Sequence, residues 1–145
     1  MVSSYSDFIE GEEIVHGVSK TILESENHQF CLLTMNHHPL HTNHVFAKNT
    51  IFGKPVVVGT LVFSISVGIT VEDISSGCIA NLGYEDVIHH LPVFCGDTIK
   101  CKTTVLDKRL SKSSPNRGVV AVETKVENQH NELVLSFQRT MLFEV

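Results

Sequence analysis

The chain has 145 residues, of which 42% are hydrophobic and 19% are charged. This length and balance are typical of one globular domain over residues 1–145, and they exclude an intrinsically disordered chain. Sixteen acidic against eleven basic residues give a formal charge of −5 at pH 7. We therefore expect neither nucleic acid nor an anionic membrane surface to be the main partner of this protein.

The longest apolar stretch, residues 56–71, is interrupted by glycine, serine and threonine. It is also shorter than the roughly 20 residues that a membrane-spanning helix needs. The first residues show no basic start followed by an apolar run, so we expect no secretory signal. The four cysteines are dispersed and form no Cys-x-x-Cys pair, which favours reduced thiols over disulfides or a zinc site. Together these features predict a cytoplasmic protein.

The first half of the chain predicts an opening strand and then short helices. β-Branched residues over 14–22 indicate the strand. Ser25 is the expected N-cap of a helix that runs to residue 35, and Pro39 prevents its continuation because proline has no amide hydrogen. Thr42 or Asn43 can cap a second short helix that ends at residue 48.

A longer buried helix is expected to begin between residues 55 and 60. After Gly77 the apolar residues recur at every second position, which is the period of a β-strand. The expected strands lie near residues 14–22, 78–91, 98–109, 118–127 and 133–144. These elements predict an α+β fold in which an antiparallel sheet packs on one long helix. Because such a sheet has free edges, we also expect a homodimer that pairs one of them.

The densest polar cluster is the segment 36–44, which contains four histidines. One interpretation is a metal site, since His41 and His44 would share a helical face. However, Pro39 separates them from the other two histidines, and no Cys, Asp or Glu lies close by to complete the ligand set. A second interpretation is a polar turn with hydrogen-bonded histidines. The third is a loop histidine that faces a cleft and acts as a general acid and base near pH 7.

The order of residues around this cluster resembles the signature of the MaoC-like dehydratases, the family that includes (R)-specific enoyl-CoA hydratases. That signature reads Gly-Asp-x-Asn-Pro-Leu/Ile-His with an alanine downstream, and a later Pro-Val-x-x-Gly-Asp opens a strand. The matching segments here are Pro39-Leu40-His41, Ala47, residues 53–59, Leu82-Gly83 and residues 91–98. Residues 110–115 and Asn128-Gln129 are similar to the branch that includes mesaconyl-CoA hydratases.

The resemblance implies a hot-dog fold, in which an antiparallel sheet wraps around a long central helix. It further implies a homodimer with sites near the subunit interface and an acyl-CoA thioester as the substrate. The implied reaction is reversible hydration of a trans-2-enoyl-CoA to a 3-hydroxyacyl-CoA, without a metal or an organic cofactor.

The resemblance also implies roles for individual residues. His41 matches the catalytic histidine, and Gly68 matches the glycine whose amide binds the thioester oxygen. Val67 stands where some relatives have a serine. Val58 stands where many relatives have a histidine, directly before Gly59. Val58 and Gly59 are expected to contact the substrate. If the long helix begins early, the Gly68 amide lies in its interior and is free to bind substrate only if the helix kinks there. The alternative is that Gly59 and Gly68 only allow close packing of the helix against the sheet.

Asn36 occupies the position of the catalytic aspartate of the family, and Met35 that of the preceding glycine. Asparagine can orient a water molecule but cannot take up a proton. Three hypotheses follow. His41 acts as the only acid and base while Asn36 orients the water, or His37 or His38 supplies a second base, or the site binds acyl-CoA without hydrating it.

Lys108, Arg109, Lys112 and Arg117 form a basic cluster in an otherwise acidic chain. It is either a solvated loop or a site for the phosphates of coenzyme A, with Lys112 and Arg117 as the binding residues. Two alternatives to the hydratase also remain. One is a non-catalytic acyl-CoA-binding protein. The other is a thioesterase, although thioesterases of this fold typically carry an acidic residue near the central helix, and residues 56–71 contain none.

Overall fold

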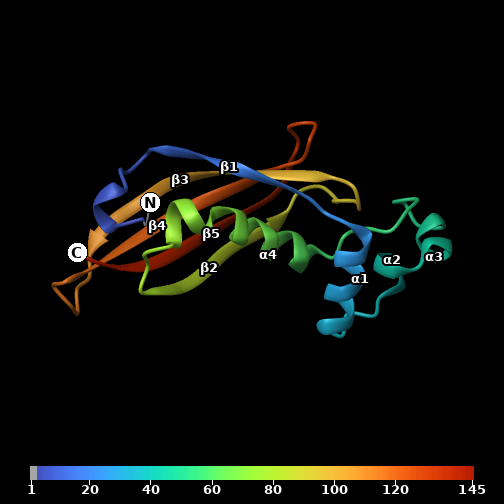
Figure 1. Cartoon of the computed structure of the whole chain (residues 1–145), viewed down its shortest axis with the longest axis horizontal. Coiled ribbons are helices and arrows are strands. Elements are labelled where there is room, and N and C mark those ends of the chain that lie inside the picture. Colours follow the sequence, from blue (N-terminus) through green and yellow to red (C-terminus); the bar gives the residue numbers. More distant parts are fainter. Residues whose placement is uncertain (1–2) are drawn as a thin grey trace.

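The computed structural model describes residues 3–145 and shows a curved antiparallel sheet that wraps around one helix (Figure 1). In chain order the elements are the 3-10 turn η1 (Tyr5–Asp7), β1 (Glu13–Thr21), α1 (Glu24–Leu33), α2 (Pro39–Thr42), α3 (His44–Lys48), α4 (Gly59–Thr70), the π-helix η2 (Val71–Ser75), β2 (Ala80–His89), β3 (Thr98–Leu110), β4 (Arg117–Glu127) and β5 (Leu133–Glu144). The strand order is β1-β3-β4-β5-β2, and every neighbouring pair is antiparallel. The predicted α+β architecture is confirmed.

Helix α4 lies in the curve of the sheet, and α1, α2 and α3 gather beyond its N-terminal end (Figure 1). It begins at Gly59, inside the predicted range. Leu61, Val62 and Ile69 on its sheet-facing side are buried, whereas Thr60, Ser64 and Gly68 on the opposite side are exposed. Among residues 3–145, no helix has the length and apolar character needed to cross a membrane.

Of the two helix caps predicted in the first half of the chain, one is wrong and one is confirmed. Helix α1 starts at Glu24, so Ser25 lies inside its first turn and the predicted Ser25 cap is wrong. The side chain of Glu26 provides the cap instead, because its Oε2 accepts the Leu23 amide at 2.8 Å. For α3 the Asn43 alternative is confirmed, since the Asn43 side-chain oxygen accepts the Phe46 amide at 2.9 Å.

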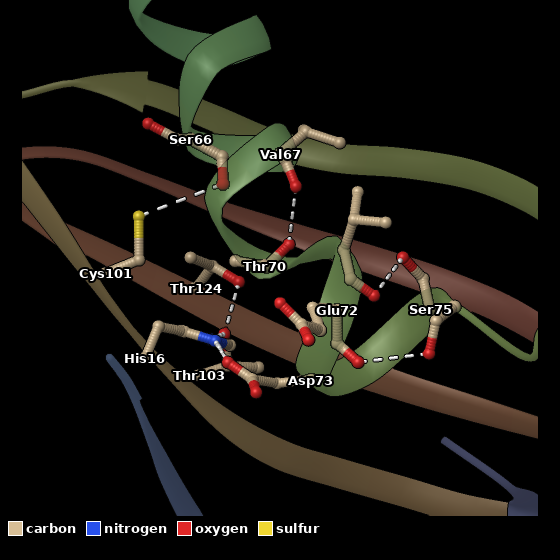
Figure 2. Close-up of polar contacts among 12 residues, drawn as sticks. His16, Ser66, Val67, Thr70, Glu72, Asp73, Ser75, Cys101, Thr103 and Thr124 are labelled. Atoms are coloured by element: carbon tan, nitrogen blue, oxygen red, sulfur yellow. Dashed lines mark hydrogen bonds and ion pairs between the residues drawn. The ribbon is translucent and has the colours of Figure 1, made fainter. Parts of the chain in front are cut away.

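A buried polar network links η2, the π-helix that follows α4, to the sheet (Figure 2). The His16 side chain is fully buried, and its Nδ1 lies 2.6 Å from the Asp73 carboxylate in η2. Its Nε2 lies 2.7 Å from the Thr103 hydroxyl, which in turn lies 2.9 Å from the Thr124 hydroxyl. The network therefore joins β1, η2, β3 and β4, and its buried ring nitrogens and hydroxyls are all hydrogen-bonded.

Met35 ends helix α1 in a left-handed conformation, with φ at +59°. The Asn36 amide donates to the Cys31 carbonyl at 3.0 Å, and the Met35 amide donates to the Leu32 carbonyl at 3.4 Å. This pair of bonds defines a Schellman motif, whose left-handed position is usually glycine because a Cβ is disfavoured there. Met35 is 80% exposed, so packing contributes little to offset the strain.

We expect Met35→Gly to stabilise the protein by about 0.5–1 kcal/mol, because relief of the left-handed strain exceeds the added entropy of the unfolded chain. Thermal denaturation should show a rise in Tm of about 2–4 °C for a chain of this size. Met35→Ala keeps the Cβ and is the control, for which no rise is expected. An equal rise for the two variants would show that the backbone conformation at residue 35 is not the cause.

Candidate active site

A cavity of about 390 Å³ opens beside the first turn of α4. Seven of its lining residues are apolar, namely Phe52, Val56, Val57, Val62, Leu91, Pro92 and Val93. The others are Gly59 and three histidines, His41, His89 and His90. The imidazoles are therefore the titratable side chains in the described lining of this cavity. A small acyl group would meet apolar walls and a base.

His41 enters this cavity from the short helix α2, whereas the sequence predicted a loop at this position. The helix begins with proline, and His38 caps it by accepting the Leu40 amide on its own Nδ1 at 3.1 Å. The His41 ring is half-buried, and its Nδ1 lies 2.8 Å from the Val56 carbonyl oxygen. Because a carbonyl can only accept, the hydrogen resides on Nδ1 and the Nε2 lone pair is free. Such an imidazole is oriented to act as a general base.

The Asn27 side chain binds the main chain at His41 and at Val58. This side chain, on α1, is fully buried. Its Nδ2 donates to the His41 carbonyl oxygen at 3.0 Å, and its Oδ1 accepts the Val58 amide at 2.9 Å. One side chain thus joins α2 to the residue that precedes α4.

Gly59 provides the first helical amide of α4, at the position where amides have no partner within the helix. Among the described residues, no hydrogen bond is made by this amide. A Cβ at Gly59 would lie 2.8 Å from Cε1 of His89, so the close approach of the His89 ring favours glycine here. The Gly59 amide and the His41 ring consequently line the same cavity.

The other two residues predicted around the central helix do not line this cavity. Gly68 is the tenth residue of α4, lies on its exposed side and has open space where a Cβ would be. Val67 packs against the core, and its carbonyl accepts the Thr70 hydroxyl at 2.8 Å (Figure 2). The structure therefore brings Gly59, rather than Gly68 or Val67, to His41. Val58 is buried at the N-cap and contributes its amide to Asn27 instead of a side chain to the cavity.

Asn36 is half-buried and also lies outside the described lining. Its Oδ1 accepts the His38 amide at 3.4 Å, so the side chain folds back on its own loop. His37 and His38 are exposed and do not line the cavity, although the His38 ring packs edge-on against the His41 ring with centroids 6.0 Å apart. In the metal interpretation His44 was a ligand, and here it pairs with Glu24. No group of three or more potential ligands is placed to hold a metal ion within residues 3–145.

The basic cluster divides into two parts. Lys108 donates to the Phe8 carbonyl at 2.8 Å and lies over the Tyr5 ring, so it anchors the N-terminal segment. Lys112 and Arg117 line a second hollow of about 360 Å³, together with Arg109 and the serines between them. Most of these residues belong to the loop between β3 and β4 or to its flanks. That loop lies at the end of the sheet opposite to α1, α2 and α3 (Figure 1). Within one chain, Lys112 and Arg117 are thus far from His41.

Three residues of this site were not predicted from the sequence: Asn27, His89 and His90. Asparagine is a poor helix former, and Asn27 near the start of a predicted helix was the available signal for a tertiary role. His89 and His90 fall inside a predicted strand, where nothing local indicates that the strand end meets the start of α4.

Comparison with known proteins identifies the family. The model of the MaoC like domain matches residues 7–128. Mesaconyl-CoA hydratase of Cereibacter sphaeroides is 34% identical over 138 residues, which are 95% of this chain and 40% of that protein. The (R)-specific enoyl-CoA hydratase of Aeromonas caviae is 27% identical over 119 residues, covering 82% of this chain and 84% of that protein. The chain thus spans about two fifths of the length of the mesaconyl-CoA hydratase.

Comparison with solved structures leads to the same family and identifies the fold. The monoamine oxidase regulatory protein of Archaeoglobus fulgidus superposes with a TM-score of 0.88 at 37% identity, over 99% of this chain and 95% of that one. A Mycobacterium tuberculosis protein described as a double hot-dog fold gives a TM-score of 0.86 at 19% identity, over 99% of this chain and 44% of that one. The sheet around α4 is therefore the hot-dog fold, and the chain belongs to the MaoC-like dehydratase domain family.

Proposed function

We propose that this chain hydrates a trans-2-enoyl-CoA to a 3-hydroxyacyl-CoA and catalyses the reverse dehydration. The observation that carries the proposal is the joint presence of the His41 imidazole and the Gly59 amide in one apolar cavity. The activities for which the relatives are named support it, since they are a mesaconyl-CoA hydratase and an (R)-specific enoyl-CoA hydratase. An unsaturated CoA thioester of the mesaconyl type is accordingly our first choice of substrate.

Water addition starts at His41. Its Nε2 takes a proton from a water molecule, and the hydroxyl oxygen bonds to the β-carbon of the enoyl thioester. The electrons of the double bond move toward the carbonyl, so negative charge develops on the thioester oxygen. The Gly59 amide donates to that oxygen, and the N-terminal end of the α4 dipole adds to the stabilisation.

The second step returns the same proton. The imidazolium at His41 protonates the α-carbon, which restores the thioester carbonyl and leaves His41 neutral. Bonds and charges balance without any oxidant, metal or organic cofactor. A single imidazole can both accept and return the proton, so the cycle favours the hypothesis in which His41 is the only acid and base.

Loss of the ultraviolet absorbance of the conjugated enoyl thioester, with crotonyl-CoA and mesaconyl-CoA, tests the proposed function. A chain that binds these thioesters in a thermal-shift assay but leaves the absorbance unchanged is the non-catalytic alternative. Release of free thiol would identify the thioesterase alternative. Residues 59–70 carry no carboxylate, and Asp73 in η2 is paired with His16, so we favour hydration over thioester hydrolysis.

We further propose a homodimer built on β2, which is an edge strand of the sheet. Strand β2 and its flanks expose a row of large apolar side chains: Ile79, Leu82, Tyr84, Val87, Ile88 and Leu91. An unpaired edge with such side chains favours pairing with a second copy. Sedimentation velocity at micromolar concentration should show a dimer, and Val87→Asp should shift it to monomer. A wild-type monomer at that concentration would contradict the proposal.

Antiparallel pairing of β2 with its symmetry mate would join the two distant parts of the site. Strand β2 runs about 30 Å from its Ala80 end to its His89 end. The hollow lined by Leu82, Lys112 and Arg117 lies at the first end, and the His41 cavity lies at the second. In an antiparallel dimer each end meets the opposite end of the partner strand. We therefore propose that Lys112 and Arg117 bind the CoA phosphates for the cavity of the partner subunit.

The double variant Lys112→Ala/Arg117→Ala is expected to raise KM for CoA thioesters at least tenfold, while KM for pantetheine thioesters, which lack the nucleotide phosphates, stays within twofold. Steady-state kinetics with both substrates measure the difference. A mixed dimer of one Lys112→Ala/Arg117→Ala subunit and one His41→Ala subunit has a single complete site, with His41 from the first subunit and the basic residues from the second. Its activity should therefore be about half that of the wild-type dimer. Equal losses for both substrates, or no recovery in mixed dimers, would contradict the assignment.

The state of the cysteines fits a reducing compartment, and we propose the cytoplasm as the location of the protein. Cys31, Cys78, Cys95 and Cys101 are all free thiols. Burial raises the pKa of the Cys101 thiol to about 12, which keeps it protonated and unreactive at neutral pH. Such thiols serve packing in the core rather than chemistry.

A further inference from the structure

The base and the amide of the proposed site belong to different elements, and their separation must be set by something outside both. His41 lies on α2, whereas Gly59 begins α4 after an intervening segment that includes α3. Both groups must lie within about 3 Å of the same small acyl group, and a shift of about 1 Å can lower the rate about 10²-fold. A rigid connection between the two elements is therefore needed.

Asn27 makes that connection. Its amide nitrogen donates to the carbonyl of His41 itself, at 3.0 Å, and its amide oxygen accepts the amide of Val58, the residue directly before Gly59, at 2.9 Å. The residue is 0% exposed, so both hydrogen bonds are shielded from competing water while the side chain is in place. An asparagine amide is also planar, which fixes the geometry between its donor and acceptor.

We infer that Asn27 is a positioning residue, whose single side chain sets the position of the His41 base relative to the Gly59 amide. Asn27 does not line the cavity and takes no part in proton transfer. The carbonyl of His41 is held by Asn27 while the ring of His41 is held by the Val56 carbonyl, so release of the first contact should loosen the second. This inference rests on the proposed hydratase function.

Two variants separate the two bonds of Asn27. Asn27→Asp, measured at about pH 9 so that the buried carboxyl is ionised, keeps an oxygen for the Val58 amide but places a second oxygen opposite the His41 carbonyl, so it removes only the contact to α2. Asn27→Ala removes both contacts. Asn128→Ala is the matched control, because Asn128 is also buried and holds a turn through three hydrogen bonds, to His130 and Glu132, outside the His41 cavity. All three variants should lower Tm, and Asn27→Asp should retain the fold at 10 °C.

The first readout is steady-state hydration of crotonyl-CoA at temperatures where each variant is folded. Both Asn27 variants should lose about 10- to 100-fold in kcat with KM within threefold, and Asn128→Ala should lose less than threefold. A general loss of stability would affect the control equally. Wild-type kcat in a folded Asn27→Asp protein would overturn the inference.

The second readout does not depend on activity. In NMR spectra with 15N-labelled histidine, wild-type His41 should be the tautomer with hydrogen on Nδ1, with an observable Nδ1 proton bonded to Val56. Asn27→Asp should lose that proton signal and mix the tautomers, whereas Asn128→Ala should keep both features. An unchanged His41 signal in the Asn27 variants would overturn the inference. If wild type shows no hydration of any enoyl-CoA, the proposed function fails while this measurement still decides the positioning role.

Discussion

His41→Ala is expected to lower kcat for enoyl-CoA hydration by about 10²–10⁴-fold, because general acid and base catalysis contributes that much. The ring is half-buried and its only side-chain hydrogen bond among the described residues is to the Val56 carbonyl, so the fold should survive. Stopped-flow or steady-state absorbance of the enoyl thioester measures the loss, and circular dichroism checks the fold. A variant that retains more than about a tenth of wild-type kcat would remove His41 from the mechanism.

Asn36→Asp is the comparison for this experiment, since it creates the carboxylate that the family signature has at that position. The Asn36 side chain folds back on the His38 amide and lies outside the described cavity lining. We therefore expect kcat to stay within about tenfold of wild type. Complete loss of activity in a folded Asn36→Asp protein would show that Asn36 takes a direct part in the chemistry. Creation of activity in an otherwise inactive chain would support the non-catalytic hypothesis for the natural sequence.

Gly59→Pro is expected to lower kcat by about 10²–10³-fold, which is the usual effect of removing one oxyanion-stabilising donor. Proline removes the amide hydrogen but suits the first position of a helix, and Val58 has the extended conformation, φ −60° and ψ 130°, that precedes proline. The helix should therefore remain intact while the donor is lost. Steady-state kinetics with crotonyl-CoA, together with a thermal melt, measure the two effects separately.

Gly59→Ala is the matched control, because it introduces the same Cβ toward the exposed His89 ring but keeps the amide. We expect a loss of less than tenfold, since the tip of the His89 side chain can move. Gly68→Ala is a second control. It should leave kcat unchanged and stabilise the helix by up to about 1 kcal/mol. Equal losses for Gly59→Pro and Gly59→Ala would assign the effect to the shape of the cavity rather than to the donor.

The sequence by itself determined the strands of this protein and the approximate position of α4, but it did not predict η1, α2 or η2. Strands β3, β4 and β5 lie within one residue of the predicted ranges, because alternation of apolar and polar residues is a local property of a strand. The Asn43 cap of α3 was predictable for the same reason, since a cap and its helix are neighbours in the chain. The order of the motif segments around His41 was also sufficient to indicate the family and, through it, the hot-dog fold.

Only the tertiary structure decided which of these residues meet. His16 and Asp73 are 57 residues apart in sequence, and Asn27 and Val58 are 31 apart; no periodicity relates such positions. Gly59 and Gly68 lie on the same predicted helix, and the residue at which α4 begins decided which amide is free. The placement of His89 against Gly59, and of Lys112 and Arg117 at the far end of the sheet, follows from strand order and sheet curvature. These depend on packing of the whole chain, because non-local contacts are set by the burial of many side chains together rather than by any one segment.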